Sequence, residues 1–190
     1  MEEPEFRILA SFFPETGRIR TTKDIEQISG YSHERVHTIL TELEKKGSVI
    51  RRKFGRVNVY KLNTTANTLL PYVFFMEKEK DAFSSSNAVL NDKIIDIVSK
   101  VEDFCDALVL TRSGEKSKIN FLCFLKEDNG SIRKKVAGVV GKNVVFMKIS
   151  EFVHASKQMR ETAINGIVLS GIDTFHRIAY RRGNENAEEI

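Results

Sequence analysis

Apolar side chains early in the chain recur at the spacing of an α-helix. Ile25 and Ile28 give one short helix a single apolar face, and a second stripe follows at i, i+3, i+4 and i+7. Thr22 is expected to cap the first helix, Gly30 to end it in the left-handed conformation, and Ser32 to cap the second helix. The stripe that predicts the second helix consists of Val36, Ile39, Leu40 and Leu43.

Beyond Gly47 the apolar pattern changes to a period of two, which predicts strands. The chain is expected to turn around Phe54, Gly55 and Arg56. The sequence therefore predicts a hairpin directly after the second helix. Its alternating positions are Val49, Arg51, Lys53, Val57, Val59 and Lys61.

Two helices joined by a tight turn and followed by a basic hairpin resemble the winged helix-turn-helix family of DNA-binding proteins. The resemblance covers about the first third of the chain. It implies that the second helix is the recognition helix, that the hairpin is the wing, and that the partner is double-stranded DNA. The implied contacts are polar residues off the apolar stripe and basic residues of the hairpin, namely Ser32, His33, Arg35, His37, Thr38, Thr41, Arg51, Arg52, Lys53, Arg56 and Lys61.

The distribution of charge agrees with DNA binding. Between Lys45 and Lys61 the chain carries seven Lys and Arg residues and no Asp or Glu. Such charges stay close together on a small hairpin, where they can neutralise several phosphates. The formal net charge is +4, and residues 1–63, with 12 Lys and Arg against 9 Asp and Glu, account for +3 of it. The alternative is a solvated hairpin kept soluble by its cations, as edge strands often are.

Composition places the chain among soluble globular proteins. It has 190 residues, of which 41% are apolar and 29% charged, enough for one large or two small domains. The acidic start lacks a signal-peptide core, and no apolar run approaches the ~20 residues that span a bilayer. We therefore expect a cytoplasmic protein with no membrane partner. The two cysteines, Cys105 and Cys123, are too few for a disulfide framework and are expected to be buried thiols.

Breaks in the pattern divide the chain into an expected two-domain α+β or α/β protein. Residues 1–63 form the winged helix, residues 64–87 an apolar linker that ends in a serine-rich hinge, residues 88–180 a second domain, and residues 181–190 a flexible tail. Within the linker the run 69–76 is strongly apolar and must be covered. Pairing across a homodimer axis is one expectation, and packing within one chain is the alternative.

The apolar pattern of the second domain predicts a helix over residues 88–104, a strand over 106–111, a strand over 119–125, a helix over 130–140, a strand over 144–149 and a helix over about 151–158 that Ser150 caps. This order of helix, strand, loop, strand, helix, strand and helix resembles a minimal nucleotidyltransferase. Much of the likeness lies in its closing segment, where Gly166 to Gly171 read Gly-Ile-Val-Leu-Ser-Gly. The resemblance implies a mixed sheet flanked by helices. It also implies an archaeal type of protein, since such domains are fused to winged helices there.

The catalytic positions of that family are altered in this chain. The family has a Gly-Ser pair and then a Ser-Asp-x-Asp run whose carboxylates hold metal. Ser113 and Ser117 match its serines, but Arg112 replaces the glycine, and Lys118 and Asn120 replace the carboxylates. A lysine at a magnesium ligand position puts positive charge where the metal belongs, and an amide oxygen is a weaker ligand than a carboxylate. We therefore expect no catalysis and no cofactor.

The same loop remains a candidate anion site without metal. Its residues Arg112, Ser113, Lys116 and Lys118 add three positive charges, and they suit a nucleotide or an acidic protein segment. Ordinary solvated loop charges are the favoured alternative.

Residues 33–37 read His-Glu-Arg-Val-His, which matches the HExxH zinc motif. The extended form of that motif fails, because Leu40 and Leu43 of the packing stripe stand where its Gly and third His belong. Exposed DNA-facing residues are therefore the preferred interpretation.

The leading hypothesis is a non-enzymatic, sequence-specific transcriptional regulator whose inactive second domain serves in dimerisation or in ligand or partner binding. One alternative is a nucleotidyltransferase with relocated metal ligands. The other is an antitoxin-like module that binds another protein.

Overall fold

The computed structural model describes residues 3–112, 119–141 and 143–180 of a mixed α+β chain with two sheets. These residues fall into two compact units, 3–75 and 76–180. Each unit contains one of the two sheets, so each is described by itself. The predicted flexible tail, 181–190, lies outside the described residues.

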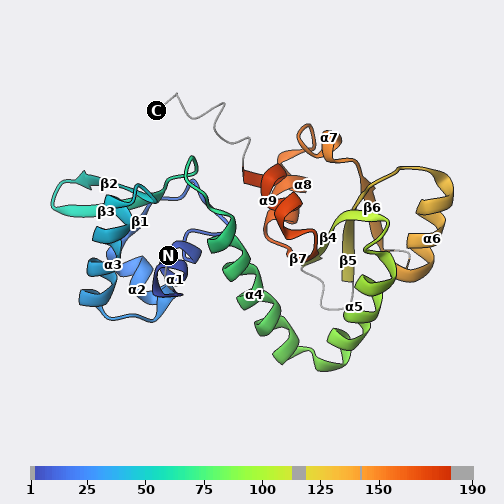
Figure 1. The fold of residues 1–190 in the computed structure, drawn as a ribbon, viewed down its shortest axis with the longest axis horizontal. Coiled ribbons are helices and arrows are strands. Elements are labelled where there is room, and N and C mark those ends of the chain that lie inside the picture. Colours follow the sequence, from blue (N-terminus) through green and yellow to red (C-terminus); the bar gives the residue numbers. More distant parts are fainter. Residues whose placement is uncertain (1–2, 113–118, 142, 181–190) are drawn as a thin grey trace. The chain divides into compact units, whose positions relative to one another are not determined.

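The first unit packs helices on a small antiparallel sheet of strand order β1-β3-β2 (Figure 1). In α3 the predicted apolar stripe is buried, with Val36, Leu40 and Leu43 fully buried and Ile39 half-buried. In α2 the predicted apolar face is correct only for Ile25, because Ile28 is 53% exposed. The elements are α1 (Glu3–Ala10), β1 (Arg20–Thr21), α2 (Thr22–Ser29), α3 (His33–Lys45), β2 (Val49–Phe54) and β3 (Val57–Leu62).

The ends of α2 follow from two local interactions. Thr21, and not the predicted Thr22, is its N-cap: the Thr21 hydroxyl accepts from the backbone N–H of Asp24 at 3.2 Å, and the Asp24 carboxylate accepts from the Thr21 N–H at 2.7 Å. Gly30 ends the helix with φ of 72°, as predicted. Ser32 occupies the N-cap position of α3, but its side chain makes no capping hydrogen bond.

The predicted hairpin is present, with Phe54 paired to Val57 across the Gly55-Arg56 turn. The short first strand consists of Arg20 and Thr21, which pair with β3, whereas the neighbouring Ile19 is 47% exposed.

Helix α4 (Leu69–Ser86) is continuous through the serines that were expected to form a hinge. The hydroxyls of Ser85 and Ser86 donate to the carbonyls of Asp81 and Ala82, four residues back, at 2.8 and 2.9 Å. Serines bonded in this way remain compatible with a helix, so of the residues predicted to form a hinge only Asn87 lies outside the helices. The helix ends only before Asn87.

Part of the apolar run in α4 is covered within the chain. In the first unit the ring of Phe13 lies 5.2 Å from that of Tyr72 and 5.8 Å from that of Phe75, centroid to centroid. Leu70, two residues before Tyr72, remains 57% exposed.

The second unit is a layered α/β structure around a mixed sheet of strand order β6-β5-β4-β7. Strand β4 is antiparallel to β5 and β7, whereas β5 and β6 are parallel. The elements are α5 (Ala88–Val101), β4 (Cys105–Arg112), β5 (Ile119–Leu125), α6 (Gly130–Val140), β6 (Val144–Met147), α7 (Ile149–Phe152), α8 (Lys157–Ile164), β7 (Ile167–Ser170) and α9 (Ile172–Tyr180).

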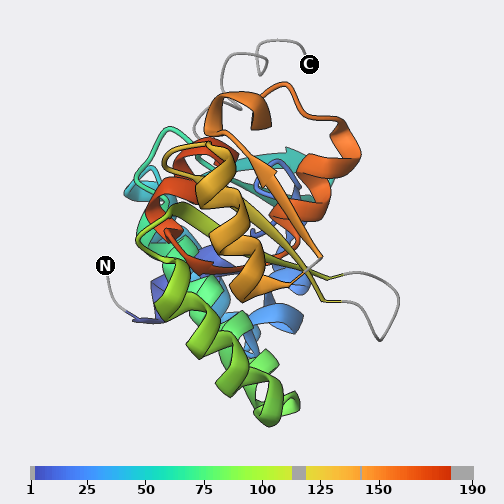
Figure 2. The ribbon, with the colours of Figure 1, turned by 90° about the vertical axis from the view of Figure 1, so that its right-hand side faces the viewer.

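Alternation along the strands gives this sheet two apolar faces. One face packs with α5 and α6 and includes both cysteines, which are buried and free as predicted (Figure 2). On the other face Phe124 of β5 contacts Phe152 of α7 and Phe175 of α9, with ring centroids 5.3 and 6.0 Å away. Helices therefore cover the sheet on both sides.

The region after β6 differs from the expectation of one helix from residue 151 to 158 capped by Ser150. Lys148 precedes the short α7, and its backbone N–H donates to the Glu151 carboxylate at 3.1 Å. Ser156 then caps α8 by accepting from the N–H of Met159 at 3.2 Å.

Among the described residues, no helix combines the length and apolar character needed to cross a membrane.

Candidate nucleic-acid interface

One side of α3 is polar and open to solvent. The buried stripe at helical period turns the remaining side chains away from the core of the first unit. Of the residues singled out from the sequence on this segment, Thr41 is half-buried and the others are exposed, namely Ser32, His33, Arg35, His37 and Thr38.

Local contacts orient several of these side chains. The guanidinium of Arg35 lies 4.1 Å from the centroid of the Tyr31 ring, and the Nδ1 atom of His33 lies 2.6 Å from the Oε1 atom of Glu26 on α2. The hydroxyls of Thr38 and Thr41 donate to backbone carbonyls four residues back, each at 2.9 Å. Their oxygens can still accept a hydrogen bond from a ligand. Arg35 supplies a planar set of donors on the same surface.

The wing is defined here as the β2–β3 hairpin (Val49–Leu62). Most of its first strand, β2, is exposed to solvent. Only Val49 of that strand is buried, and the next five residues are exposed on both faces. A strand that buries neither face contributes little to a core. Its side chains are instead free to meet another molecule.

Ion pairs divide the cations of this region into two groups. Lys45 and Lys46 pair with Glu42 and Glu5, and the Nε atom of Arg51 lies 3.2 Å from a carboxylate oxygen of Glu44. Within the part of the chain that the structure describes, the other four cations have no carboxylate within ion-pair distance. These unpaired wing cations are Arg52, Lys53, Arg56 and Lys61.

Sequence reasoning missed an exposed apolar surface beside these cations. Phe54 and Val57 face each other at the wing tip, and they are 60% and 52% exposed. Residues paired across antiparallel strands share a face, so alternation places Arg52 on the same side as Phe54. Recognising the exposed pair from sequence would have required knowing that neither face of β2 is covered.

The HExxH string contributes no visible metal site. His33 is engaged with Glu26, as described above, and among the described residues no three His, Cys, Asp or Glu side chains are grouped so as to hold a metal ion.

The loop predicted to bind an anion in the second unit is not described. Ser113, Lys116 and Lys118 fall outside the described residues, and of Arg112 only the backbone in β4 is described. Asn120 lies in β5 opposite Thr111, whose hydroxyl donates to the Asn120 carbonyl at 3.0 Å. The expected loss of catalysis and the expected anion site at this loop therefore remain predictions.

Comparison with protein-family models, with curated proteins and with solved structures finds no match to the chain. Functional inference therefore depends on the residues themselves, and among the described residues the exposed side of α3 with its neighbouring wing is the candidate surface for a nucleic acid.

Proposed function

We propose that the first unit is a winged helix-turn-helix domain that binds double-stranded DNA, and that the protein is a sequence-specific transcriptional regulator. The observation that carries this proposal is the group of four unpaired wing cations on a hairpin whose first strand, β2, is exposed on both faces beyond Val49. Strand β2 follows directly after α3, and Arg51 pairs with Glu44 of that helix. Basic wing and polar helix surface therefore lie close together.

In this proposal the two parts of the surface have different tasks. An α-helix fits the major groove, where Arg35, His37 and Thr38 can meet base edges. The wing cations meet phosphates, which fix the register of the protein and supply affinity without sequence information. Ser32, whose hydroxyl is not used in capping, suits a phosphate contact at the start of α3.

The test begins with selection of bound duplexes from a random pool, followed by salt titration of the best sequence. Each phosphate contact contributes about 0.9 to the slope of log affinity against log salt concentration. Replacing all four wing cations by Gln should therefore lower the magnitude of the slope by about 3–4. The residues replaced in this variant are Arg52, Lys53, Arg56 and Lys61.

A control variant removes the same charge from exposed cations of the second unit. It should retain the slope of the unaltered protein. An unaltered slope in the wing variant, or an equal decrease in the control, would exclude the wing from the interface, and failure to select any duplex would contradict the proposal itself. The control replaces Lys93, Lys134, Lys157 and Arg160 by Gln.

We also propose that the regulator is a homodimer. One winged helix offers a small footprint, and a two-fold pair can read two half-sites. Leu70 of α4 remains 57% exposed although its neighbours Tyr72 and Phe75 pack within the chain, so it is the position at which to disturb a dimer. Sedimentation should show a dimer at micromolar concentration that Leu70→Asp weakens, and a monomer with and without DNA would contradict this.

The second unit is proposed to be non-catalytic, because the sequence puts Lys118 and Asn120 where metal-binding carboxylates would be required. Magnesium-dependent transfer of a nucleotide to a protein or nucleic acid would contradict this assignment.

A further inference from the structure

A cavity of about 760 Å³ opens at one edge of the sheet in the second unit. Its volume lies within the range of sites for small organic ligands. The cavity is lined by the ends of strands and by α9, and it combines an apolar base with charged side chains. Both features distinguish it from a gap between solvated loops.

The residues that follow three of the strands lie at this edge. Strands β5 and β6 are parallel, and β7 runs in the same direction because both β5 and β7 are antiparallel to β4. The carboxyl ends of all three therefore meet at one edge, which is where ligands bind in open α/β sheets. The residues that line the cavity after these ends are Lys126 and Asp128 after β5, Lys148 and Ser150 after β6, and Thr174 and Arg177 after β7.

This edge is opposite to the one at which the resemblance to nucleotidyltransferases would place a site. The β4–β5 loop follows the carboxyl end of β4, and β4 runs antiparallel to the other three strands. The residue of β4 that lines the cavity is Asp106, near the start of that strand. A ligand here would therefore be independent of the altered catalytic positions.

Charges around the cavity favour an anion. Of the lining carboxylates, Asp128 is already held by two bonds from Arg133, from Nε at 2.5 Å and from Nη2 at 2.7 Å. The Arg133 hydrogen bonds lower the pKa of Asp128 and keep it ionised. Of the three lining cations, Lys126 donates from Nζ to the Glu102 carbonyl at 3.2 Å, and Arg177 donates from Nη2 to the Thr174 hydroxyl at 3.2 Å. This leaves Asp106 against Lys148 and Arg177.

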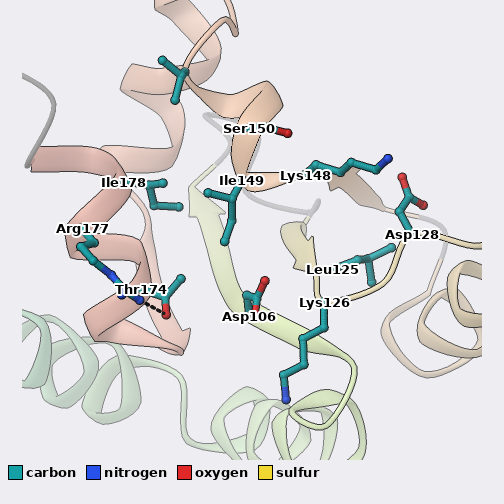
Figure 3. Close-up of a pocket in the computed structure, with 11 residues that line it drawn as sticks. Asp106, Leu125, Lys126, Asp128, Lys148, Ile149, Ser150, Thr174, Arg177 and Ile178 are labelled. Carbon is teal, nitrogen blue, oxygen red and sulfur yellow. Dashed lines mark hydrogen bonds between the residues drawn. The ribbon is translucent and has the colours of Figure 1, made fainter.

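The positions of these groups define what a ligand must offer. In Figure 3, Arg177 and Lys148 lie on opposite sides of Ile149, and Asp106 lies below it. Leu125 and Ile178 complete an apolar surface between the charges. The arrangement requires an anionic group of high charge, a body that can cover apolar side chains, and a donor such as a hydroxyl for Asp106.

We propose that this cavity binds a hydroxylated phosphomonoester, of the size of a sugar phosphate or a nucleoside monophosphate. The phosphate dianion lies at Arg177, whose guanidinium donates to its oxygens, and Lys148 on the opposite side of Ile149 donates to an oxygen at the other end of the ligand. The ligand hydroxyls donate to Asp106, and the carbon skeleton lies on Leu125, Ile149 and Ile178. This inference does not depend on DNA binding, and it is tested without DNA.

The experiment is isothermal titration calorimetry of the full chain with a pentose monophosphate, a hexose monophosphate and the four ribonucleoside monophosphates, in EDTA. Each is compared with its unphosphorylated counterpart and with inorganic phosphate. At least one phosphomonoester should bind more tightly than both of its references. Arg177→Gln and Lys148→Gln should each weaken it about tenfold, the loss of one charge-assisted hydrogen bond.

Two control variants locate the site. Lys134→Gln removes an exposed cation of α6 that does not line the cavity, and it should leave affinity unchanged. The double variant Arg112→Gln with Lys118→Gln should also leave it unchanged. Loss of binding in that double variant alone would move the site to the β4–β5 loop and overturn the proposal. Absence of binding by every phosphomonoester at millimolar concentration would do so too, provided that circular dichroism shows a folded protein.

Discussion

The guanidinium of Arg35 stacks over the ring of Tyr31, 4.1 Å from its centroid. Tyr31 belongs to the turn between α2 and α3, and Arg35 stands on the first turns of α3. Arg7 of α1 also lies over this ring, at 5.2 Å. One aromatic residue in the turn thus positions the strongest hydrogen-bond donor on the proposed DNA-contacting side of α3.

Removing the ring should weaken specific DNA binding more than non-specific binding. An exposed cation–π contact is worth about 0.5–1 kcal/mol, so Tyr31→Ala should weaken binding of the selected duplex by about 2- to 5-fold, because Arg35 loses its fixed orientation. Tyr31→Phe retains the ring and should bind as the unaltered protein does. Competition assays against the selected and a scrambled duplex measure both. Equal losses on the two duplexes would show that Arg35 does not read bases.

Neighbouring arginines of the wing should differ in their salt dependence. Arg52 is unpaired among the described residues, whereas Arg51 is held by Glu44 at 3.2 Å. Arg52→Gln should therefore lower the slope of log affinity against log salt by about 0.9, and Arg51→Gln by less. Glu44→Gln releases Arg51 and should raise non-specific affinity. Identical slopes for the two arginine variants would argue against a role for this ion pair.

Secondary structure was most predictable where apolar runs had clear boundaries. The sequence predicts a strand over residues 119–125 and a helix over residues 130–140, and the structure has β5 and α6 with those bounds. Polar signals were less reliable. The serine-rich segment before Asn87 reads as a hinge, yet Ser85 and Ser86 satisfy their hydroxyls on the preceding turn of α4. Composition alone does not reveal this local alternative.

The two candidate sites differ in how far sequence could locate them. Residues of α3 and the wing are close in sequence, so periodicity predicted their common surface. The cavity residues Lys126, Lys148 and Arg177 are far apart in sequence and line one cavity only because β5, β6 and β7 run in the same direction and end at one edge. Strand order and direction, which no local pattern contains, create that site. Likewise, the pairing of Arg51 with Glu44 required the packing of β2 on α3.

The capping interaction of α2 predicts a dependence of stability on acid. Hydrogen bonds from the Thr21 backbone and hydroxyl lower the pKa of the Asp24 carboxyl. A carboxylate whose pKa is lower in the folded state stabilises above its unfolded value of about 3.9, and this contribution is lost as pH falls through the folded pKa. Urea unfolding should thus show a smaller loss of stability between pH 5 and 2 in Asp24→Asn than in the unaltered protein. Coincident pH profiles would contradict a contribution from this cap.

Gly171 lies between β7 and α9 and approaches the backbone of Asp106 closely, at the edge of the sheet that carries the cavity. It has φ of 68°, and a Cβ atom added there would lie 1.9 Å from the carbonyl oxygen of Asp106. Gly171→Ala combines left-handed strain with a collision against backbone, so it should destabilise the protein by more than about 2 kcal/mol. Gly138 is the matched control, since it lies in α6 with nothing within 4 Å of an added Cβ. Gly138→Ala should stabilise by about 0.5–1 kcal/mol through helix propensity. Chemical denaturation of both variants measures the difference, and a Gly171→Ala variant as stable as the parent would mean that β7 and α9 do not approach Asp106 as closely as described.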